Sequence, residues 1–384
     1  MSNLHRTSAP ELAILSVLES LPNLRASDLH VICDAVPKIR VDGALMNLPG
    51  AGVWSKADVE AYLMSLLNEE QRNRFEADLE LDFSFKLNNA IRFRINLYLQ
   101  QNCMGAAIRV IPEKILSLEA LGVPEVLASF TELPRGLVLV TGPTGSGKST
   151  TLAAMIDRIN HSRAVHIMTV EDPIEFVHSS DKAMVNQREV GSDTHSFADA
   201  LRHVLRQDPD VILIGELRDY ETISAALTAA ETGHLVFATL HTQDAAQTIN
   251  RIVDVFPADQ QAQIRIQLAL TLRGIVSQVL VPHISGKGRV AASEILVVNP
   301  AIANMIRENK AFQIPTTMMA GKDEGMQGLD QDLANRVQSR LISLQAAYDV
   351  AHDREALMKL IGRGHGFLAV EADSKMNPHG KKPR

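Results

Sequence analysis

The sequence predicts an α/β nucleotide-binding domain preceded by a smaller α+β domain, and three observations support this. Short apolar runs alternate with helical stretches in the middle of the chain: GLVLVTG, VHIMTV, DVILIG and LVFATL. Such runs are typical of parallel strands that are buried on both faces. The first run ends in a glycine-rich phosphate-loop pattern. Before these runs, helices are mixed with hairpins, as in small α+β domains.

Length and composition indicate a globular protein of two or three domains. The chain has 384 residues, of which 46% are hydrophobic and 22% charged. These proportions are ordinary for a folded protein with sizeable cores. The formal net charge of -7 argues against a broad nucleic-acid-binding surface, so we expect no nucleic acid partner.

Cysteine content and the N-terminal sequence favour a cytoplasmic location. Cys33 and Cys103 are too few for a disulfide framework and lack metal-ligand spacing. We therefore predict two separate buried thiols in a reducing compartment. The chain begins without a signal-peptide pattern, and no apolar run approaches the roughly 20 residues that cross a bilayer.

Residues 1–112 form the predicted α+β domain. Helical spacing, alternation and tight-turn dipeptides define its parts. In chain order we expect a helix at 11–21, a hairpin turning at Asp42-Gly43, a helix at 55–67, a hairpin turning at Asn88-Asn89 and a strand at 106–112.

The rest of the chain divides into a linker, the nucleotide-binding domain and a tail. Residues 113–134, with two prolines and little strand signal, are predicted to be a linker in which a short helix can form. The α/β domain spans 135–365 and has a helical C-terminal part. In that part Asn299 caps a helix that starts at Pro300, and one face of a later helix carries Leu329, Leu333, Val337 and Leu341. Residues 366–384 are predicted to be disordered.

The phosphate loop is the most specific motif. It matches GxxxxGK[ST], with an apolar strand before it and a helix-forming stretch beginning at Thr150 after it. Its glycines let successive backbone N–H groups face phosphate oxygens, Lys148 reaches the β- and γ-phosphates, and Ser149 ligates Mg²⁺. A chance glycine-rich turn is the weaker interpretation. The loop comprises Gly142, Pro143, Thr144, Gly145, Ser146, Gly147, Lys148 and Ser149.

Hydrolysis also needs carboxylates, and two candidates follow predicted strands. Glu171 follows VHIMTV, and Glu216 follows VILIG. Open α/β sheets bind ligands at these strand ends. Either residue alone could be a helix cap or a salt-bridge partner, but their occurrence after a complete phosphate loop favours a catalytic role.

Four motifs in order give a resemblance to a known family. TGPTGSGKSTT, TVEDPIEFVH, RQDPDVILIGELRD and AAETGHLVFATLHT resemble the phosphate loop, Asp box, Walker B segment and His box of type II/IV secretion ATPases. RFRIN, VNQREV, RIVDVFP and GMQ are similar to the PilT subfamily of type IV pilus retraction motors. The likeness covers residues 26–345.

The resemblance implies an architecture and a set of partners. It implies a PAS-like N-terminal domain and a RecA-like ATPase domain, with ATP bound between them and Mg²⁺ as the cofactor. It also implies a homohexamer at the cytoplasmic face of the inner membrane. The expected partners are a membrane platform protein of the pilus and a second retraction ATPase.

Residue roles follow from the same resemblance. Glu171 matches the candidate general base, and Glu216 the Walker B glutamate that acts on Mg²⁺ and water. Both glutamates are expected at the Mg²⁺ site with Ser149. His234 and His241 match the His box, which contacts or senses the nucleotide site. By pattern alone, these histidines would be core or strand-end residues.

Arginines outside the phosphate loop receive roles by resemblance too. Arg94 and Arg109 match arginines of the N-terminal domain that reach the phosphates, although strand alternation alone would place Arg94 on a solvated face. Arg202 and Arg206 match arginines near the site and the subunit boundary.

The sequence therefore predicts an ATP-hydrolysing motor for pilus retraction, with alternatives left open. Ala303 in AIANMIREN (301–309) stands where the PilT subfamily has arginine, which leaves an ATPase of pilus assembly or of secretion as an alternative. A non-hydrolytic nucleotide-binding regulator and a nucleic-acid translocase are disfavoured by the two glutamates and the acidic charge, respectively.

Overall fold

The structure is a computed structural model that describes residues 9–41, 43–87, 91–111 and 115–362. The chain divides into two compact units. Unit 1 comprises Met1–Ile115 with Pro173–Val177, and unit 2 comprises Leu116–Asp172 with His178–Arg384. The turn dipeptides predicted at 42–43 and 88–89 fall partly or wholly outside the described residues, as does the tail at 366–384.

Unit 1 is an α+β unit built on a six-stranded antiparallel sheet in the order β3-β2-β1-β6-β5-β4. Helices α1 and α2 pack on each other, and α2 packs on β6. The elements are α1 (Ala9–Ser20), β1 (Ala26–Val31), β2 (Lys38–Val41), β3 (Ala44–Asn47), α2 (Lys56–Ser65), α3 (Glu69–Asp78), β4 (Glu80–Leu87), β5 (Ile91–Gln100) and β6 (Cys103–Ile111).

Local sequence explains most of unit 1. Phe93 and Ile95 of β5 are fully buried, because alternate residues of a strand point to the same face. Both predicted hairpins are confirmed as antiparallel pairs, β2 with β3 and β4 with β5. Helix α3 was not predicted because Phe75 is its one buried residue and it has no apolar period; a capping box from Asn68 to Gln71 starts it.

The cysteine prediction is wrong. The structure joins Cys33, just after β1, to Cys103, the first residue of β6, in a disulfide, and both residues are half-buried. Their Cα atoms lie 6.4 Å apart because β1 and β6 are neighbours in the sheet. Two cysteines 70 residues apart give no sign of this pairing in the sequence.

Unit 2 contains a seven-stranded sheet in the order β13-β12-β7-β11-β10-β8-β9. All neighbouring strands are parallel except β12 and β13. The strands are β7 (Gly136–Thr141), β8 (His166–Glu171), β9 (Met184–Glu189), β10 (Val211–Ile214), β11 (Leu235–Leu240), β12 (Leu272–Pro282) and β13 (Arg289–Val297). Every residue of β7, β10 and β11 is buried, as the apolar runs predicted.

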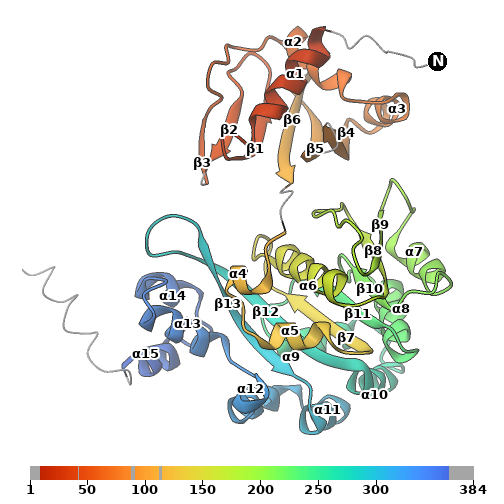
Figure 1. Ribbon diagram of the computed structural model, residues 1–384, viewed down its shortest axis with the longest axis vertical. Helices are drawn as coiled ribbons and strands as arrows, with labels where there is room; N and C mark the ends of the chain where they lie inside the picture. The colour runs from red at the N-terminus through yellow and green to blue at the C-terminus, as the bar shows by residue number, and fades with distance from the viewer. Residues whose placement is uncertain (1–8, 42, 88–90, 112–114, 363–384) are drawn as a thin grey trace, which may run out of the picture. The chain divides into compact units, whose positions relative to one another are not determined.

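Helices cover both faces of this sheet (Figure 1). One core contains side chains of α4, α5 and α6, and the other contains side chains of α7–α12. The helices are α4 (Leu118–Leu121), α5 (Val126–Thr131), α6 (Lys148–Ser162), α7 (Phe197–Val204), α8 (Tyr220–Glu231), α9 (Ala245–Asp254), α10 (Gln261–Thr271), α11 (Pro300–Arg307) and α12 (Ile314–Ala320).

From Leu116 on, the segment predicted to be a linker belongs to unit 2 and contains the short helices α4 and α5. Helices α4 and α5 bury Leu118, Leu127 and Phe130 in the core shared with α6. Helices of four and six residues are too short for a periodic pattern to reveal. Pro124 and Pro134 flank α5 rather than marking an open connection.

The C-terminal part is helical, but two long strands precede it. Strands β12 and β13 were not predicted, since the C-terminal part was expected to be helical. Helix α11 starts at Pro300 with Asn299 as its cap, as predicted. Helix α13 (Leu329–Gln338) ends before Leu341, so three of the four predicted residues lie on it. With α14 (Leu344–Val350) and α15 (Arg354–Gly362), it packs on the β12–β13 pair.

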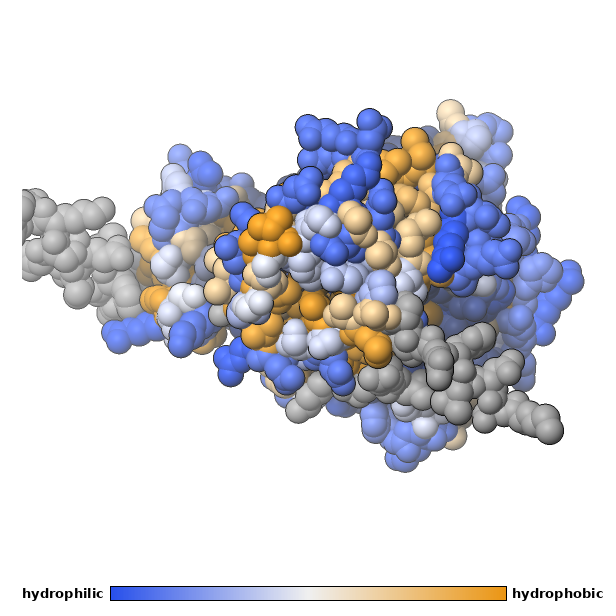
Figure 2. All heavy atoms as spheres, turned by 90° about the horizontal axis from the view of Figure 1, so that it is seen from above, coloured by the Kyte–Doolittle hydropathy of each residue, from blue (hydrophilic) through white to orange (hydrophobic). Residues whose placement is uncertain are grey.

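No helix in the described part of the chain combines the length and apolarity needed to span a membrane. The face drawn in Figure 2 has hydrophobic groups separated by hydrophilic ones.

Candidate functional site: a phosphate loop and two carboxylates at one sheet edge

The carboxyl ends of four neighbouring parallel strands bring the main candidates to one edge of the sheet. In lateral order, β7 leads into the phosphate loop, β11 into His241, β10 into Glu216, and β8 ends in Glu171. Adjacent strands are spaced about 4.8 Å apart, so the β10 strand lies roughly 10 Å from the β7 strand. Ligands of open α/β sheets bind at this edge.

The phosphate loop runs from β7 into α6 with glycine at the positions that need it. Gly142 and Gly147 have φ angles of 136° and 90°. A side chain at either would also collide with Gln278 of β12. At these two glycines the loop backbone packs so closely against β12 that no side chain fits between them.

The start of α6 is arranged for an anion. Gly147 is the N-cap residue and has no side chain to cap the helix, so N–H groups of the first turn stay available for a ligand. Lys148 Nζ donates to the carbonyl oxygens of Gly142 and Pro143, at 2.8 and 3.1 Å, which holds the ammonium over the loop. Ser146 Oγ is buried and has no hydrogen-bond partner among the described residues.

Glu216 lies between the side chains of Arg218 and His241. His241 Nε2 is 3.1 Å from Glu216 Oε1, and Arg218 Nη2 is 2.8 Å from Glu216 Oε2. Burial acts to raise the pKa of Glu216, but the hydrogen bond and charge of Arg218, together with His241, outweigh it and lower that pKa. The hydrogen bond to Glu216 in turn raises the pKa of Arg218. Glu216 is thus an anion at neutral pH.

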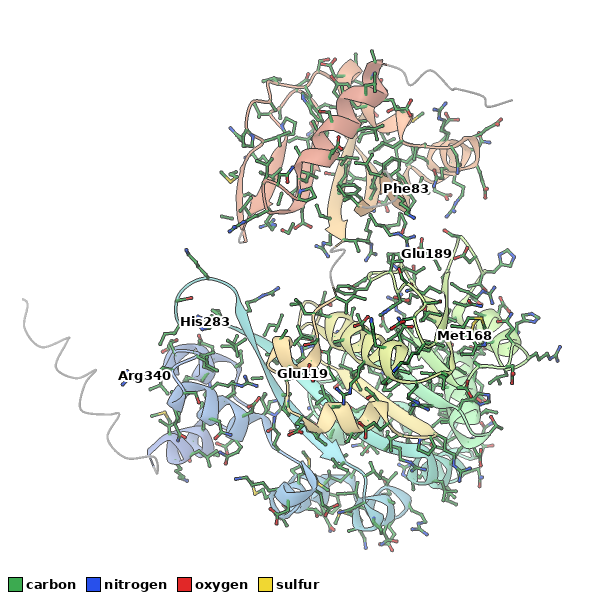
Figure 3. All side chains as sticks on the ribbon, viewed as in Figure 1. Phe83, Glu119, Met168, Glu189, His283 and Arg340 are labelled. Carbon is green, nitrogen blue, oxygen red and sulfur yellow. A yellow bond between two sulfur atoms is a disulfide. The ribbon has the colours of Figure 1, made fainter. Side chains whose placement is uncertain are left out.

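Hydrogen bonds from β8 and β9 orient the carboxylate of Glu171. Thr169 Oγ1 donates to Glu171 Oε1 over 2.6 Å, and Gln187 Nε2 of β9 donates to the same oxygen over 3.1 Å. Figure 3 labels Met168 in β8 and Glu189 at the end of β9, the two strands that provide this environment. Gly215 lies beside Glu171, since a Cβ at Gly215 would be 3.3 Å from Glu171 Cα.

A cavity of about 320 Å³ opens beside Glu216. It is lined by Glu216, Leu217, Arg218, Leu240, His241, Thr242 and Arg251. The carboxyl edge of β10 and β11 therefore has room for a small ligand next to an ionised carboxylate.

The two histidines of the His box lie at opposite ends of β11. His241 follows the strand and reaches Glu216, whereas His234 precedes it and its Nδ1 lies 3.0 Å from the Ala229 carbonyl oxygen. Six strand residues separate their backbones by about 20 Å. The structure thus brings His241 to the candidate site and places His234 at the other edge.

Arg94 and Arg109 lie in unit 1, on the exposed face of its sheet. They are directly opposite each other on β5 and β6. Two carboxylates offset this like-charge pair: Arg109 Nε donates to Asp28 Oδ1 over 2.9 Å, and Arg94 Nε is 3.9 Å from Asp82 Oδ1. Burial acts to raise the pKa of Asp28, but hydrogen bonds from Ser27 and Arg109 lower it.

Arg202 and Arg206 are exposed, near the C-terminal end of α7. Arg202 Nη1 is 3.4 Å from Asp199 Oδ1, one turn earlier. Arg206 follows the helix.

Sequence reasoning missed three residues around the site: Arg218, Gln187 and Gln278. The first follows Glu216 by two positions in ELRD and could have been found as a cation next to a strand-end carboxylate. The other two come from β9 and β12, whose positions in the sheet no local pattern indicates.

Together, the loop after β7 and the carboxylates on neighbouring parallel strands define a P-loop nucleotide-binding α/β protein. A family model described as Type II/IV secretion system protein matches residues 7–347. The chain belongs to this family, and the α/β fold class is as predicted.

Individual relatives point to pilus motors. The chain is 52% identical over 328 residues to the type IV pilus retraction ATPase PilT of Pseudomonas aeruginosa, covering 85% of this chain and 94% of that protein. It is 50% identical to a twitching motility protein of Neisseria gonorrhoeae, covering 90% and 92%. A crystal structure of the pilus retraction motor PilT with bound ADP superimposes with a TM-score of 0.84 at 46% identity, covering 90% of this chain and 99% of that one. The resemblance to PilT found in the sequence is confirmed.

Proposed function

We propose that this chain is an ATP-hydrolysing motor that powers retraction of a type IV pilus by disassembling its pilin filament. The observation that carries the proposal is the alignment of the phosphate loop, Glu216 with His241, and Glu171 along one sheet edge. The similarity to a PilT protein and to a twitching motility protein, each over more than four-fifths of the chain, supports the mechanical role.

The proposed division of chemical work gives the two glutamates different roles. The guanidinium of Arg218 helps to lower the pKa of Glu216, so Glu216 stays ionised and suits a role next to a metal. Glu171 stands at the end of β8, where hydrogen bonds from Thr169 and Gln187 orient its carboxylate, and it is the proposed general base for the attacking water. Loop N–H groups and Lys148 hold the phosphates, with Thr150 in the first turn of α6.

Mg²⁺ is the proposed cofactor. The described residues contain no group of three or more His, Cys, Asp and Glu side chains that could hold a metal ion by themselves, and a Mg²⁺ site completed by phosphate and water oxygens needs none. Ser149, Glu171 and Glu216 would hold the ion. When bound, Mg²⁺ neutralises charge that develops on the transferred phosphoryl group.

Residues away from this edge have proposed roles as well. Turnover is proposed to depend on Arg94 and Arg109 of unit 1, and ring assembly on Arg202 and Arg206. The working form is proposed to be a homohexamer at the cytoplasmic face of the inner membrane, engaged with a platform protein and a second retraction ATPase.

Lys148→Ala in the source organism tests the direction of the motor. The variant removes the phosphate-binding ammonium, so we expect cells with abundant surface pili and no surface motility, scored by electron microscopy and spreading assays. Wild-type chain supplied in trans should restore motility.

Bald cells would instead assign the protein to pilus assembly, a second candidate favoured by Ala303. This residue of α11 is half-buried against the core and provides no charge where the PilT subfamily has arginine. Unchanged pili and motility would favour the alternative of a secretion ATPase.

A further inference from the structure

Gln278 of β12 occupies an unusual place beneath the phosphate loop. The pairing of β12 with β7 ends at Ser277, opposite Thr141, while β12 continues to Pro282. Gln278 is therefore the first residue beyond the end of β7, where the chain opens into the loop. Its side chain is polar but only 3% exposed.

Two hydrogen bonds tie the Gln278 amide to both ends of the loop-helix junction. Its Nε2 donates to the Ser146 carbonyl oxygen over 2.7 Å, and its Oε1 accepts from Thr151 Oγ1 over 2.9 Å. A carbonyl oxygen can only accept, so the orientation of the amide is fixed. All three residues are at least nine-tenths buried, which makes these bonds costly to lose.

The bond to Ser146 also sets the direction of the next N–H group. In a trans peptide the C=O and N–H point in opposite directions. Because Gln278 holds the Ser146 carbonyl toward β12, the Gly147 N–H points away from β12. A Cβ at Gly147 would lie 2.8 Å from Gln278 Nε2, so this contact requires glycine in addition to its φ of 90°.

We propose that Gln278 is a positioning residue that holds the Ser146–Gly147 peptide with its N–H directed at the nucleotide phosphates. The inference rests on the proposed function, since it concerns the same nucleotide site. It predicts that loss of the amide weakens the binding of ADP and ATP more than it slows the chemical step, because the catalytic carboxylates stand on other strands.

Four variants of the full-length chain test this role. Gln278→Met keeps length and burial but removes both hydrogen bonds. Gln278→Glu keeps the acceptor for Thr151 but turns an acceptor toward the Ser146 carbonyl. Thr151→Val removes only the hydroxyl bond. Ser277→Ala is the matched control, because it removes the 2.8 Å bond to Thr141 in the same buried layer without touching the loop.

The readouts are the Kd of a fluorescent ADP analogue, KM and kcat for ATP, and Tm. We expect Gln278→Met and Gln278→Glu to raise Kd and KM by about tenfold or more with a smaller change in kcat. Thr151→Val should raise Kd by a few-fold, and Ser277→Ala should leave Kd unchanged.

A merely structural role would lower Tm in Gln278→Met and Ser277→Ala alike, with Kd unchanged in both, and that result would overturn the proposal. If Gln278→Met does not fold, an unchanged Kd for Thr151→Val is equally decisive against it. Failure of the unmodified chain to bind ADP would instead refute the proposed function itself.

Discussion

At the scale of single residues, the ionisation of Glu216 is set by its two neighbours, Arg218 and His241. Burial alone would favour the neutral acid, and the cation at 2.8 Å reverses that preference. A carboxylate with a lowered pKa keeps its charge until the pH falls through that lowered value. The acidic limb of ATPase activity that depends on Glu216 should therefore lie below the usual glutamate range.

Arg218→Gln should move this acidic limb to higher pH. Without the guanidinium, desolvation dominates and the pKa of Glu216 rises, so the active anion is lost at a higher pH. The measurement is kcat for ATP across the acidic range, with circular dichroism to confirm folding. Arg158→Gln, which loses only its pairs with the exposed carboxylates of Glu119 and Glu132, is the matched control. Identical profiles for the two variants would mean that Arg218 does not control Glu216.

At the scale of elements, a strand can place residues that are close in sequence at opposite edges of its sheet. His234 and His241 belong to one sequence motif, yet β11 carries them to different ends. Because a strand rises by about 3.3 Å per residue, the length of β11 separates the two histidines. Only the carboxyl edge of the sheet, where His241 lies, adjoins the phosphate loop.

Comparison of His241→Ala with His234→Ala tests this separation. We expect His241→Ala to lower kcat about tenfold or more, since it removes a partner of Glu216. His234→Ala should leave kcat within about twofold and lower Tm by a few degrees, because a hydrogen bond of roughly 1 kcal/mol to α8 is lost. Steady-state ATPase assays and thermal melts provide both numbers. Loss of turnover in His234→Ala at normal Tm would show that the motif acts as a unit despite its geometry.

At the scale of the whole molecule, the proposed motor needs contributions from both units. The phosphate loop and both glutamates belong to unit 2, while Arg94 and Arg109 belong to unit 1. On the sheet of unit 1 the two arginines stand side by side with carboxylates flanking them, an arrangement that keeps like charges together on an exposed face.

Arg94→Gln should lower kcat by at least about tenfold while the Kd for ADP changes little, because an arginine that acts on the transition state contributes mainly to turnover. Lys86→Gln is the control, since Lys86 is an exposed cation on the adjacent strand β4. Single-turnover hydrolysis and nucleotide titration separate the two effects. Equal kcat in both variants would mean that Arg94 has a structural role only.

The sequence by itself determined the features that depend on local chemistry. The phosphate loop could be predicted because phosphate binding requires glycines and a lysine at fixed spacing. The strands β7, β8, β10 and β11 could be read because burial on both faces demands continuous apolar runs. The strand-end positions of Glu171 and Glu216 followed directly.

Only the tertiary structure decided which distant segments meet. Nothing local to Gln278 indicates that β12 lies next to β7 and runs on beneath the loop, because strand order depends on the packing of the whole sheet. The same holds for the Cys33–Cys103 disulfide, for Gln187 beside Glu171, and for the packing of α4 and α5 where a linker was expected. Pairing between strands far apart in sequence is a property of the assembled core, and it leaves no periodic signal in either strand.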